Sequence, residues 1–515
     1  MTSIVYLIGA GPGDPGLITV RGRECLAAAD VVLYDRLVDP RLLRYAKPRA
    51  ERIDVGTAAP QPMEQEAICY LLVEKAREGK IVARLKWGDP FVFDHGGAEA
   101  LFLHEQGVRF EVVPGVPAGV AVPSYAGVPV TYPGGGDTLT FVRGHEDGGK
   151  SRTSIDWTSL ARLDGTIVCY AGPDQVAPFL GALMSHGRPP HDSAVVVYDG
   201  TLPTQRTVVG TLEEIASDVQ KAGERRPAIL VVGRVANLRE HLRWFDARPL
   251  FGKRVLVTRP REQASELVHR LESVGADAIE APMIRIEPPD DYAPLDEACA
   301  HIGAFDWVVF ASVNAVDAFI DRLLAGSQDL RALGRAKLCG VGPATAERLA
   351  RHGLRADLTP TDFRAEAMVR AIVESVGDKV EGLRFLVPRA DIGREVVAEE
   401  LRRRGGDVTE VVAYRTVIVE PEREGEPDIY RMLLERRIDV VTFTSPSAVR
   451  NFVRVLGEEP AADLLRTTVV ASIGPITAEA ASQASIETTI LPAVHTVAAM
   501  VDAIVAYFAT EKALA

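Results

Sequence analysis

The N-terminal half of the chain alternates short apolar runs with turns rich in glycine and proline. Ile4–Ile8 is an apolar run that predicts a buried strand, and the glycine-rich turn Gly9–Gly16 follows it directly. A helix is then expected to about Ala29, followed by a second strand over Asp30–Tyr34. Short apolar runs that alternate with helices are typical of an α/β fold.

Two further turns of the same kind close later apolar runs. The run from Ile81 ends in the turn Gly88–Pro90, with a helix expected to start at Gly96, and the strand from Phe110 ends at Val113–Gly115. The carboxyl ends of strands line the ligand crevice in open α/β sheets. Three such turns together favour one shared binding crevice over a set of simple connections.

The segment Trp244–Arg259 separates this half from a second one. Pro249 and Gly252 interrupt the pattern there, and the apolar run Arg254–Thr258 predicts a new buried strand directly afterwards. A chain of 515 residues also exceeds the size at which single hydrophobic cores stop growing. We therefore expect two domains, over residues 1–245 and 251–515.

The C-terminal half contains an internal repeat, in which each unit reads as a strand, a polar turn and a helix. Because only two copies are present, the repeat predicts two small parallel α/β lobes rather than a solenoid. The paired segments are Arg254–Pro260 with Arg384–Ala390, Asp306–Val316 with Asp439–Val449, and Cys339–Ala346 with Ala471–Ala478.

The polar turns of this repeat are candidates for ligand binding. Each opens a helix, where free N–H groups and hydroxyls can hold an anion, although any one of them can equally be an ordinary helix cap. The paired set favours a polyanionic ligand in a cleft between the lobes. The turn residues are Thr258, Ser312, Asn314, Gly342, Thr345, Ser445, Ser447, Gly474 and Thr477.

Composition narrows the class of protein. The chain is 47% hydrophobic and 25% charged, as expected for a globular protein, and its net charge of −13 argues against a nucleic-acid-binding surface. The five cysteines show no CxxC pair and are expected to be buried free thiols in a cytoplasmic protein. The ten histidines show no metal-ligand spacing, so no metal site is expected. We also expect no signal peptide and no membrane span.

The turn Gly11–Gly16 matches the GxGxxG pattern of dinucleotide-binding proteins. Pro12 and Pro15 lack the N–H groups that would hold a pyrophosphate. A nicotinamide-dependent enzyme is therefore a disfavoured alternative.

Motifs in the first half carry a more specific indication. They are Gly9–Pro15, Tyr34–Val38, Gly88–Phe93, Val113–Gly115, Tyr125–Pro129, Gly144–His145, Gln205–Arg206 and Pro227–Gly233. Through them residues 3–245 resemble the uroporphyrinogen-III C-methyltransferase family. The resemblance implies the tetrapyrrole-methylase fold of two α/β subdomains, S-adenosylmethionine in the cleft between them, and a homodimer formed through this half.

The resemblance also implies roles for individual residues. The family's acid/base carboxylate falls on Asp35, at the end of a predicted strand. Methyl transfer from a sulfonium needs a carbon nucleophile in line with the methyl group and a base for the proton that is lost. The implied cofactor contacts are Pro12, Trp87, Gly88, Asp89, Val92, Pro117, Ala118, Ala171, Gly200 and Ala228.

Several positions depart from the family's pattern. The family has Gly-Arg-Gly-Gly-Glu-Glu where this chain reads Asp94-His-Gly-Gly-Ala-Glu99, so cationic anchors for a polycarboxylate substrate are lost. Two interpretations stay open: the half is weakened or altered, or other arginines serve as anchors, with Arg21, Arg36, Arg84 and Arg143 as candidates. The departing positions are Thr57, Trp87, His95, Ala98, Pro133 and Ala171.

Residues 251–512 resemble uroporphyrinogen-III synthase, on the repeat order, the Phe-Ala-Ser and Phe-Thr-Ser turns and Val411–Thr416. The resemblance implies two lobes joined by a two-stranded ladder, one of 251–286 plus 418–512 and the other of 287–417. It implies closure of hydroxymethylbilane to uroporphyrinogen III without a metal or cofactor, with Tyr414 as a catalytic donor. The implied substrate contacts are Thr258, Arg259, Ser312, Asn314, Thr345, Arg389, Ser445, Ser447 and Thr477.

The sequence thus predicts a bifunctional α/β enzyme that makes uroporphyrinogen III and methylates it toward precorrin-2, feeding sirohaem or cobalamin. One alternative is that only the synthase half is active and the other half serves for dimerisation or S-adenosylmethionine binding. A second is a tetrapyrrole-binding or S-adenosylmethionine-sensing protein without turnover.

Overall fold

The computed structural model describes residues 3–56, 63–144, 155–172, 174–222, 226–259, 261–281, 284–360, 365–377, 379–391, 396–418 and 428–514. Contacts divide the chain into two compact units, which are described separately below. The first is Met1–Val255 with His269–Ala278 and Ile504–Ala515, and the second is Leu256–Val268 with Ile279–Ala503. Within the described ranges, no helix has the length and apolar character needed to cross a membrane.

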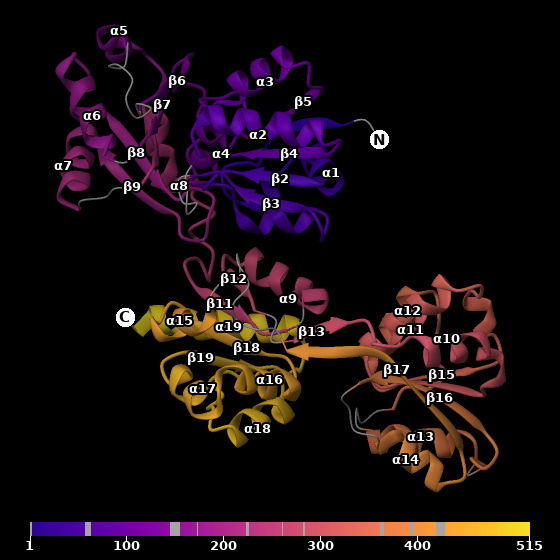
Figure 1. The fold of residues 1–515 in the computed structure, drawn as a ribbon. Coiled ribbons are helices and arrows are strands. Elements are labelled where there is room, and N and C mark those ends of the chain that lie inside the picture. The colour runs from indigo at the N-terminus through magenta and orange to yellow at the C-terminus, as the bar shows by residue number, and fades with distance from the viewer. Residues whose placement is uncertain are drawn as a thin grey trace. The chain divides into compact units, whose positions relative to one another are not determined.

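The first sheet of the N-terminal half is entirely parallel, with the strand order β3-β2-β4-β1-β5. Apolar side chains on both faces pack against helices, as parallel sheets require. Figure 1 shows its helices in indigo and violet around the strands. The elements are β1 (Ile4–Gly9), α1 (Val20–Ala28), β2 (Val31–Tyr34), β3 (Glu51–Asp54), α2 (Gln65–Arg77), β4 (Ile81–Lys86), α3 (Gly96–Glu105), β5 (Phe110–Val113) and α4 (Ala118–Tyr125), with 3₁₀ turns at Pro15–Leu17 and Pro40–Tyr45.

The second sheet is mixed, with the order β6-β7-β10-β8-β9, in which only β6 and β7 are parallel. Its central strands are mainly apolar and contribute to a core on each face of the sheet. The elements are β6 (Leu139–Arg143), α5 (Trp157–Arg162), β7 (Thr166–Ala171), α6 (Val176–Ser185), β8 (Ser193–Tyr198), β9 (Arg206–Thr211), α7 (Leu212–Ala222), β10 (Ala228–Val232), a 3₁₀ turn at Arg234–Leu238 and α8 (Arg239–Leu242).

Three glycine-containing turns meet at the carboxyl ends of the first sheet. A Cβ on Gly115 would lie 2.1 Å from the carbonyl oxygen of Gly88, and one on Gly9 would lie 2.4 Å from Gly115 Cα. Gly88 has a φ of +68° and exchanges backbone hydrogen bonds with Gly11. These turns can pack backbone against backbone only because no side chain stands between them.

The C-terminal half contains two further sheets, ordered β12-β11-β18-β19 and β13-β17-β16-β14-β15. The strands are β11 (Arg254–Val257), β12 (Asp277–Glu280), β13 (Ile284–Glu287), β14 (Trp307–Phe310), β15 (Lys337–Gly340), β16 (Arg384–Ala390), β17 (Asp407–Ile418), β18 (Val440–Phe443) and β19 (Val469–Ser472). The helices are α9 (Arg261–Ser273), α10 (Ala293–Ala300), α11 (Val313–Ala325), α12 (Pro343–Arg351), α13 (Ala365–Ser375), α14 (Val396–Arg403), α15 (Ile429–Leu434), α16 (Pro446–Leu456), α17 (Glu458–Leu465), α18 (Pro475–Gln483) and α19 (Val497–Leu514), with 3₁₀ turns at Ile302–Ala304 and Leu330–Leu333.

The strand orders of these sheets confirm the repeat predicted from the sequence. The series β12-β11-β18-β19 corresponds, strand by strand, to β17-β16-β14-β15. Even the isolated parallel bridges match, since Cys339 pairs with Leu358 in one copy and Ala471 pairs with Ile490 in the other. The two copies are linked by β13, which pairs antiparallel with the long strand β17 from Ile284–Ile418 to Glu287–Arg415. Figure 1 shows β17 as the long orange arrow.

Replacing Gly115 by alanine should destabilise the first unit by about 1–3 kcal/mol, because its Cβ would collide with the backbone of two neighbouring turns. Thermal unfolding of the whole chain would report the change. The matched control is Gly181→Ala in α6, where a Cβ meets nothing within 4 Å. Alanine there should be neutral or stabilising by up to about 1 kcal/mol. Equal unfolding temperatures for the two variants would contradict the close approach.

Candidate functional site

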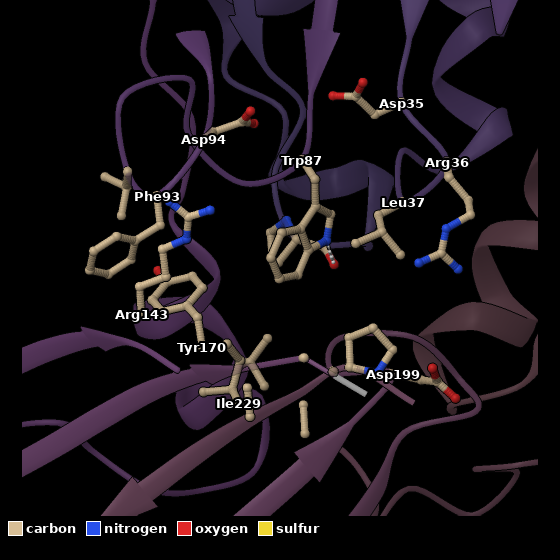
Figure 2. Close-up of a pocket in the computed structure, with 18 of the residues that line it drawn as sticks. Asp35, Arg36, Leu37, Trp87, Phe93, Asp94, Arg143, Tyr170, Asp199 and Ile229 are labelled. Carbon is tan, nitrogen blue, oxygen red and sulfur yellow. Dashed lines mark hydrogen bonds between the residues drawn. The ribbon is translucent and has the colours of Figure 1, made fainter. Parts of the chain in front are cut away.

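Residues from both sheets of the first unit line one cavity of about 530 Å³. This volume lies within the roughly 300–1,000 Å³ typical of small-molecule sites. Figure 2 shows the cavity with Trp87 at its centre and charged side chains around it. The charged lining residues are Asp35, Arg36, Asp94, Arg143 and Asp199, together with the titratable His95.

Most of the predicted cofactor contacts lie at this cavity. Seven of the sequence-predicted residues of this half line it: Pro12, Asp35, Trp87, Val92, Ala171, Gly200 and Ala228. The other four are Gly88, Asp89, Pro117 and Ala118, which build the turns behind the lining. Asp89 accepts hydrogen bonds from Gly115 N at 3.0 Å and Phe91 N at 2.8 Å, so its carboxylate braces two turns.

Trp87 joins two of the turns that carry predicted cofactor contacts. Its indole Nε1 donates a hydrogen bond to the carbonyl oxygen of Pro12 at 2.8 Å. Its ring meets that of Tyr170 edge to face, with centroids 6.4 Å apart. Tyr170 in turn accepts a hydrogen bond from Gly119 N at 2.8 Å. Trp87 therefore shapes the wall of the cavity and holds the glycine-rich turn in place.

The wall also contains strained backbone. Phe93, Asp199 and Thr201 have φ values of 54°, 47° and 70°, although none is a glycine. A β-branched threonine in this region is a true outlier, and such conformations persist only where the surrounding structure enforces them. Asp14 N donates to Thr201 Oγ1 at 3.0 Å, and Gln205 Oε1 accepts from Thr201 N. These contacts place Gly200, between two strained neighbours, on the cavity wall.

A buried ionic cluster lies beside the cavity. Arg84 and Lys86, two positions apart on β4, are each 1% exposed and contact the fully buried Glu99 of α3 at 3.3 and 2.8 Å. Arg84 also contacts Asp35 at 2.6 Å, and Lys86 contacts Asp94 at 3.0 Å. Gln65 adds a hydrogen bond to Glu99. The cluster thus links two cavity-lining carboxylates through two buried cations.

Burial and charge act in opposite directions within this cluster. Burial favours the neutral acid, but Arg84 and Lys86 outweigh it at Glu99 and lower the pKa of its carboxyl from 4.5 to about 2. At Asp94 burial prevails and raises the carboxyl pKa, with Asp35 adding to the shift and Lys86 opposing it. The cluster therefore holds one strongly acidic carboxyl and one weakly acidic carboxyl.

The four arginines considered as substrate anchors have different positions. Arg36 and Arg143 line the cavity. Arg21 instead forms a bidentate pair with the exposed Glu111, and Arg84 is committed to the buried cluster. Of the departures from the family pattern, Trp87, His95 and Ala171 line the cavity. Thr57 lies outside the described residues.

Comparison with known proteins identifies both halves. The family model described as "Tetrapyrrole (Corrin/Porphyrin) Methylases" matches residues 4–216, and that described as "Uroporphyrinogen-III synthase HemD" matches residues 265–502. The "Porphyrin biosynthesis protein HemD" of Ruminiclostridium josui is 37% identical over 93% of this chain and 93% of its own length. The chain belongs to both families, fused in this order.

Two further relatives carry methyltransferase names. The "Uroporphyrinogen-III C-methyltransferase" of Bacillus subtilis is 38% identical, over 76% of this chain and 80% of its own. The "S-adenosyl-L-methionine-dependent uroporphyrinogen III methyltransferase" of Methanosarcina barkeri is 44% identical, over 46% of this chain and 94% of its own. The predicted families, fold class, enzyme class and S-adenosylmethionine as cofactor are confirmed.

The methylase cavity fits this cofactor. S-adenosylmethionine combines an apolar adenine with a charged amino-acid end, and the cavity offers apolar walls beside charged groups. A Cβ on residue 200 would lie 2.3 Å from a side-chain carbon of Val122, so only glycine fits at this position. The cavity wall there consists of backbone atoms. When bound, the cofactor supplies an electrophilic methyl group on a positively charged sulfur.

In the synthase half, Tyr414 on β17 is 8% exposed and lies beside the start of α11. Its hydroxyl is 3.1 Å from Ser312 Oγ, which also caps α11 by accepting from Ala315 N. Burial raises the pKa of the Tyr414 hydroxyl, while its hydrogen bonds to Ser312 and Asn314 oppose the shift. Three sequence-predicted residues are thus brought together in one hydrogen-bonded group.

The remaining predicted substrate contacts of the synthase half differ in their burial and in their partners. Arg389 is ion-paired with Glu410 at 3.0 Å, and burial lowers the pKa of the Arg259 guanidinium. Ser445 caps α16 and hydrogen-bonds Ser447 at 2.9 Å. Thr258, Thr345 and Thr477 are at most 3% exposed, and Thr258 Oγ1 donates to the carbonyl of Thr442. Contact between these residues and a ligand stays a prediction.

Lys86, Asp94 and Glu99 belong to the site but were not among the residues predicted from the sequence. The sequence does contain a sign of a buried ionic cluster, because Arg84 and Lys86 alternate with apolar residues in a strand that is otherwise apolar. Two cations on one face of a buried strand require acidic partners. The partners themselves are distant in the sequence or in the following loop, so no local pattern identifies them.

Replacing Glu99 by glutamine should lower the free energy of unfolding of the first unit by roughly 3 kcal/mol at pH 7, because both buried cations lose their common partner. A carboxyl with a depressed folded pKa stabilises above its ordinary pKa of 4.5 and loses that effect as pH falls through about 2. The difference between wild type and variant should therefore shrink over this pH range.

Calorimetric unfolding at several pH values measures this difference. Glu24→Gln, on the exposed side of α1, is the control and should change stability by less than about 0.5 kcal/mol. A Glu99→Gln effect that is small at pH 7, or that does not depend on pH, would count against the ionic cluster as described.

Proposed function

We propose that the chain is a bifunctional enzyme that closes hydroxymethylbilane to uroporphyrinogen III and methylates this product with S-adenosylmethionine toward precorrin-2. The observation that carries the proposal is the match of both family models to this chain in order, at residues 4–216 and 265–502, beside a relative that aligns with 93% of each chain. We assign the two activities to residues 1–245 and 251–515. The synthase lobes are proposed as 251–286 with 418–512, and 287–417.

For the methyl transfer, the proposed binding site is the cavity between the two sheets of the first unit. Pro12, Trp87 and Ala228 belong to the wall that would hold the cofactor. Asp35 is the proposed acid/base carboxylate, held at 2.6 Å from Arg84. Arg36 and Arg143 are the proposed anchors for substrate carboxylates, since an Arg fork suits a carboxylate.

For ring closure, the proposed donor is the Tyr414 hydroxyl. Loss of hydroxide from the bilane is easier when a neutral O–H donates to the leaving oxygen. The raised pKa of Tyr414 keeps the hydroxyl protonated at neutral pH, and Ser312 and Asn314 fix its direction. Holding the flexible bilane in the closing conformation would supply much of the remaining acceleration.

We further propose that the protein is a cytoplasmic homodimer that associates through its methylase half, as the family resemblance implies. Large apolar side chains such as Phe91 and Tyr132 are 57% and 51% exposed in that half, which supports an association surface there. Sedimentation of the purified chain would give its mass in solution, and a monomer at micromolar concentration would contradict the dimer.

Purified protein incubated with hydroxymethylbilane and S-adenosylmethionine should yield a methylated type-III product, resolved by mass and isomer. Omitting S-adenosylmethionine should leave unmethylated uroporphyrinogen III, because the synthase half needs no cofactor. Unmethylated product in both incubations would restrict the activity to the synthase half and make the methylase half a binding or dimerisation module. Cofactor binding with no product of either kind would indicate a protein without turnover.

Tyr414→Phe should slow ring closure by about 10- to 100-fold, because the leaving oxygen loses its donor. The unfolding temperature should change little, since only one hydroxyl is removed. Tyr430→Phe is the control, as Tyr430 is 46% exposed on α15, and its rate should equal that of wild type. An unchanged rate for Tyr414→Phe would remove this residue from the mechanism.

A further inference from the structure

Trp87 has the largest side chain among the residues that line the methylase cavity, and the protein itself holds its ring in place. Its indole Nε1 donates to the carbonyl oxygen of Pro12 at 2.8 Å, and its ring meets that of Tyr170 edge to face. Directly after it, Gly88 exchanges backbone hydrogen bonds with Gly11, which fixes the main chain. Figure 2 shows the ring in the centre of the cavity. A ligand therefore meets an indole that is already oriented.

The hydrogen bond to Pro12 decides what Trp87 can offer to a ligand. An indole has one N–H donor and no acceptor, and this donor is already used within the protein. The π system remains, and its faces carry negative charge density. Among the aromatic side chains, tryptophan attracts a cation over its ring most strongly. The face of Trp87 therefore suits either a cation or a flat aromatic base.

The position of Trp87 in the sheet favours the cation. Trp87 directly follows β4, and Asp35 directly follows β2. These are neighbouring parallel strands whose register pairs Tyr34 with Leu85, so the two residues leave the sheet at adjacent positions on strands about 4.8 Å apart. On the proposed function, the carbon that receives the methyl group lies within reach of Asp35. Trp87 is then next to the sulfur of the cofactor rather than next to its adenine.

The charges of the cavity lining also favour a cation. Three carboxylates and two arginines line the cavity, and an excess of negative charge in a recessed site attracts cations. Figure 2 shows two of the carboxylates on the same side, beyond Trp87. The two arginines are the proposed anchors for substrate carboxylates, which would neutralise them in the complete complex. The charged residues are Asp35, Asp94, Asp199, Arg36 and Arg143.

We propose that the face of Trp87 binds the sulfonium of S-adenosylmethionine through a cation–π contact, and that the site thereby distinguishes the charged cofactor from its neutral product. The inference rests on the proposed cofactor site of the methylase half. A sulfonium carries three carbon substituents and no N–H or O–H group, so it cannot be recognised as an ordinary hydrogen-bond donor. A π face attracts it without requiring a donor, as aromatic cages do with quaternary ammonium groups.

Methyl transfer removes the charge that Trp87 recognises. A ring carbon of the substrate bonds to the methyl group, the electron pair of the broken carbon–sulfur bond stays on sulfur, and the methylated ring loses one proton to Asp35. The sulfur then belongs to a neutral thioether, for which a π face has no such attraction. Trp87 should therefore favour S-adenosylmethionine over S-adenosylhomocysteine, and so promote the exchange of product for fresh cofactor.

The test measures the binding of S-adenosylmethionine and S-adenosylhomocysteine to the full chain by calorimetry, without tetrapyrrole. In Trp87→Leu, the ratio of the S-adenosylhomocysteine Kd to the S-adenosylmethionine Kd should fall by about 3- to 10-fold, because leucine keeps apolar bulk but has no π face. Trp87→Phe keeps a π face without the N–H and should retain part of the ratio. The matched control is Trp244→Leu, since Trp244 Nε1 also donates to a backbone carbonyl, that of Ser124 at 2.9 Å, but lies outside the cavity lining.

A second measurement leaves the shape of the side chain intact. Fluorinated tryptophan, incorporated biosynthetically at all four tryptophan positions, keeps the N–H but weakens the negative charge of the π face. The same Kd ratio should fall in the wild-type chain and stay unchanged in Trp87→Leu. A fluorinated wild type that keeps its ratio would overturn the cation–π contact even if Trp87→Leu did not fold.

The contrary outcomes differ in what they overturn. If Trp87→Leu weakens both ligands equally, the sulfonium contact is wrong and Trp87 stacks on the adenine instead. If Trp87→Phe loses the ratio as completely as Trp87→Leu, the hydrogen bond to Pro12 is what matters and the proposed contact is wrong. Both results leave the proposed function intact. A wild type that binds neither ligand would overturn the proposed cofactor site together with the role of Trp87.

Discussion

Two buried cations on one strand determine the chemistry of the methylase cavity. Arg84 and Lys86 lie on β4, the middle strand of the first sheet, and neither reaches solvent. Removing such charges from water costs several kcal/mol each unless acidic partners are close. Glu99 on α3 pairs with both cations, Asp94 pairs with Lys86, and Asp35 pairs closely with Arg84 and lies 4.0 Å from Lys86. The position of the cavity carboxylates is therefore a consequence of charge neutralisation in the core behind them.

The charge balance of this cluster also explains why two of its carboxylates reach the cavity. Two cations face three carboxylates, so complete neutralisation of all five groups inside the core is impossible. Glu99 is completely buried, and the excess negative charge is left to Asp35 and Asp94, which retain some contact with the cavity. The same imbalance that would destabilise a closed core leaves two carboxylates at its edge, where the cavity begins.

The fold could be predicted from the sequence because its signals are local. The apolar run at β1, the start of α3 at Gly96 and the repeat of strand and turn in the second half all rest on neighbouring residues. The ionic cluster could not be predicted from the sequence, because its acidic residues come from elements that only the sheet topology brings together. Thr258 illustrates a related limit: the sequence shows a hydroxyl after a strand, but not that it bonds to a neighbouring strand.

Charges of opposite sign line the methylase cavity. Asp35 and Asp94 make one part of its wall negative. Such a wall attracts a sulfonium and repels the carboxylates of a tetrapyrrole. On the proposed function, the acidic side chains of the substrate would consequently face Arg36, which follows β2 of the first sheet, and Arg143, on β6 of the second. On the proposed function, the electrostatics of the cavity would therefore turn the reacting carbon of the macrocycle toward the carboxylates and its acidic groups away from them.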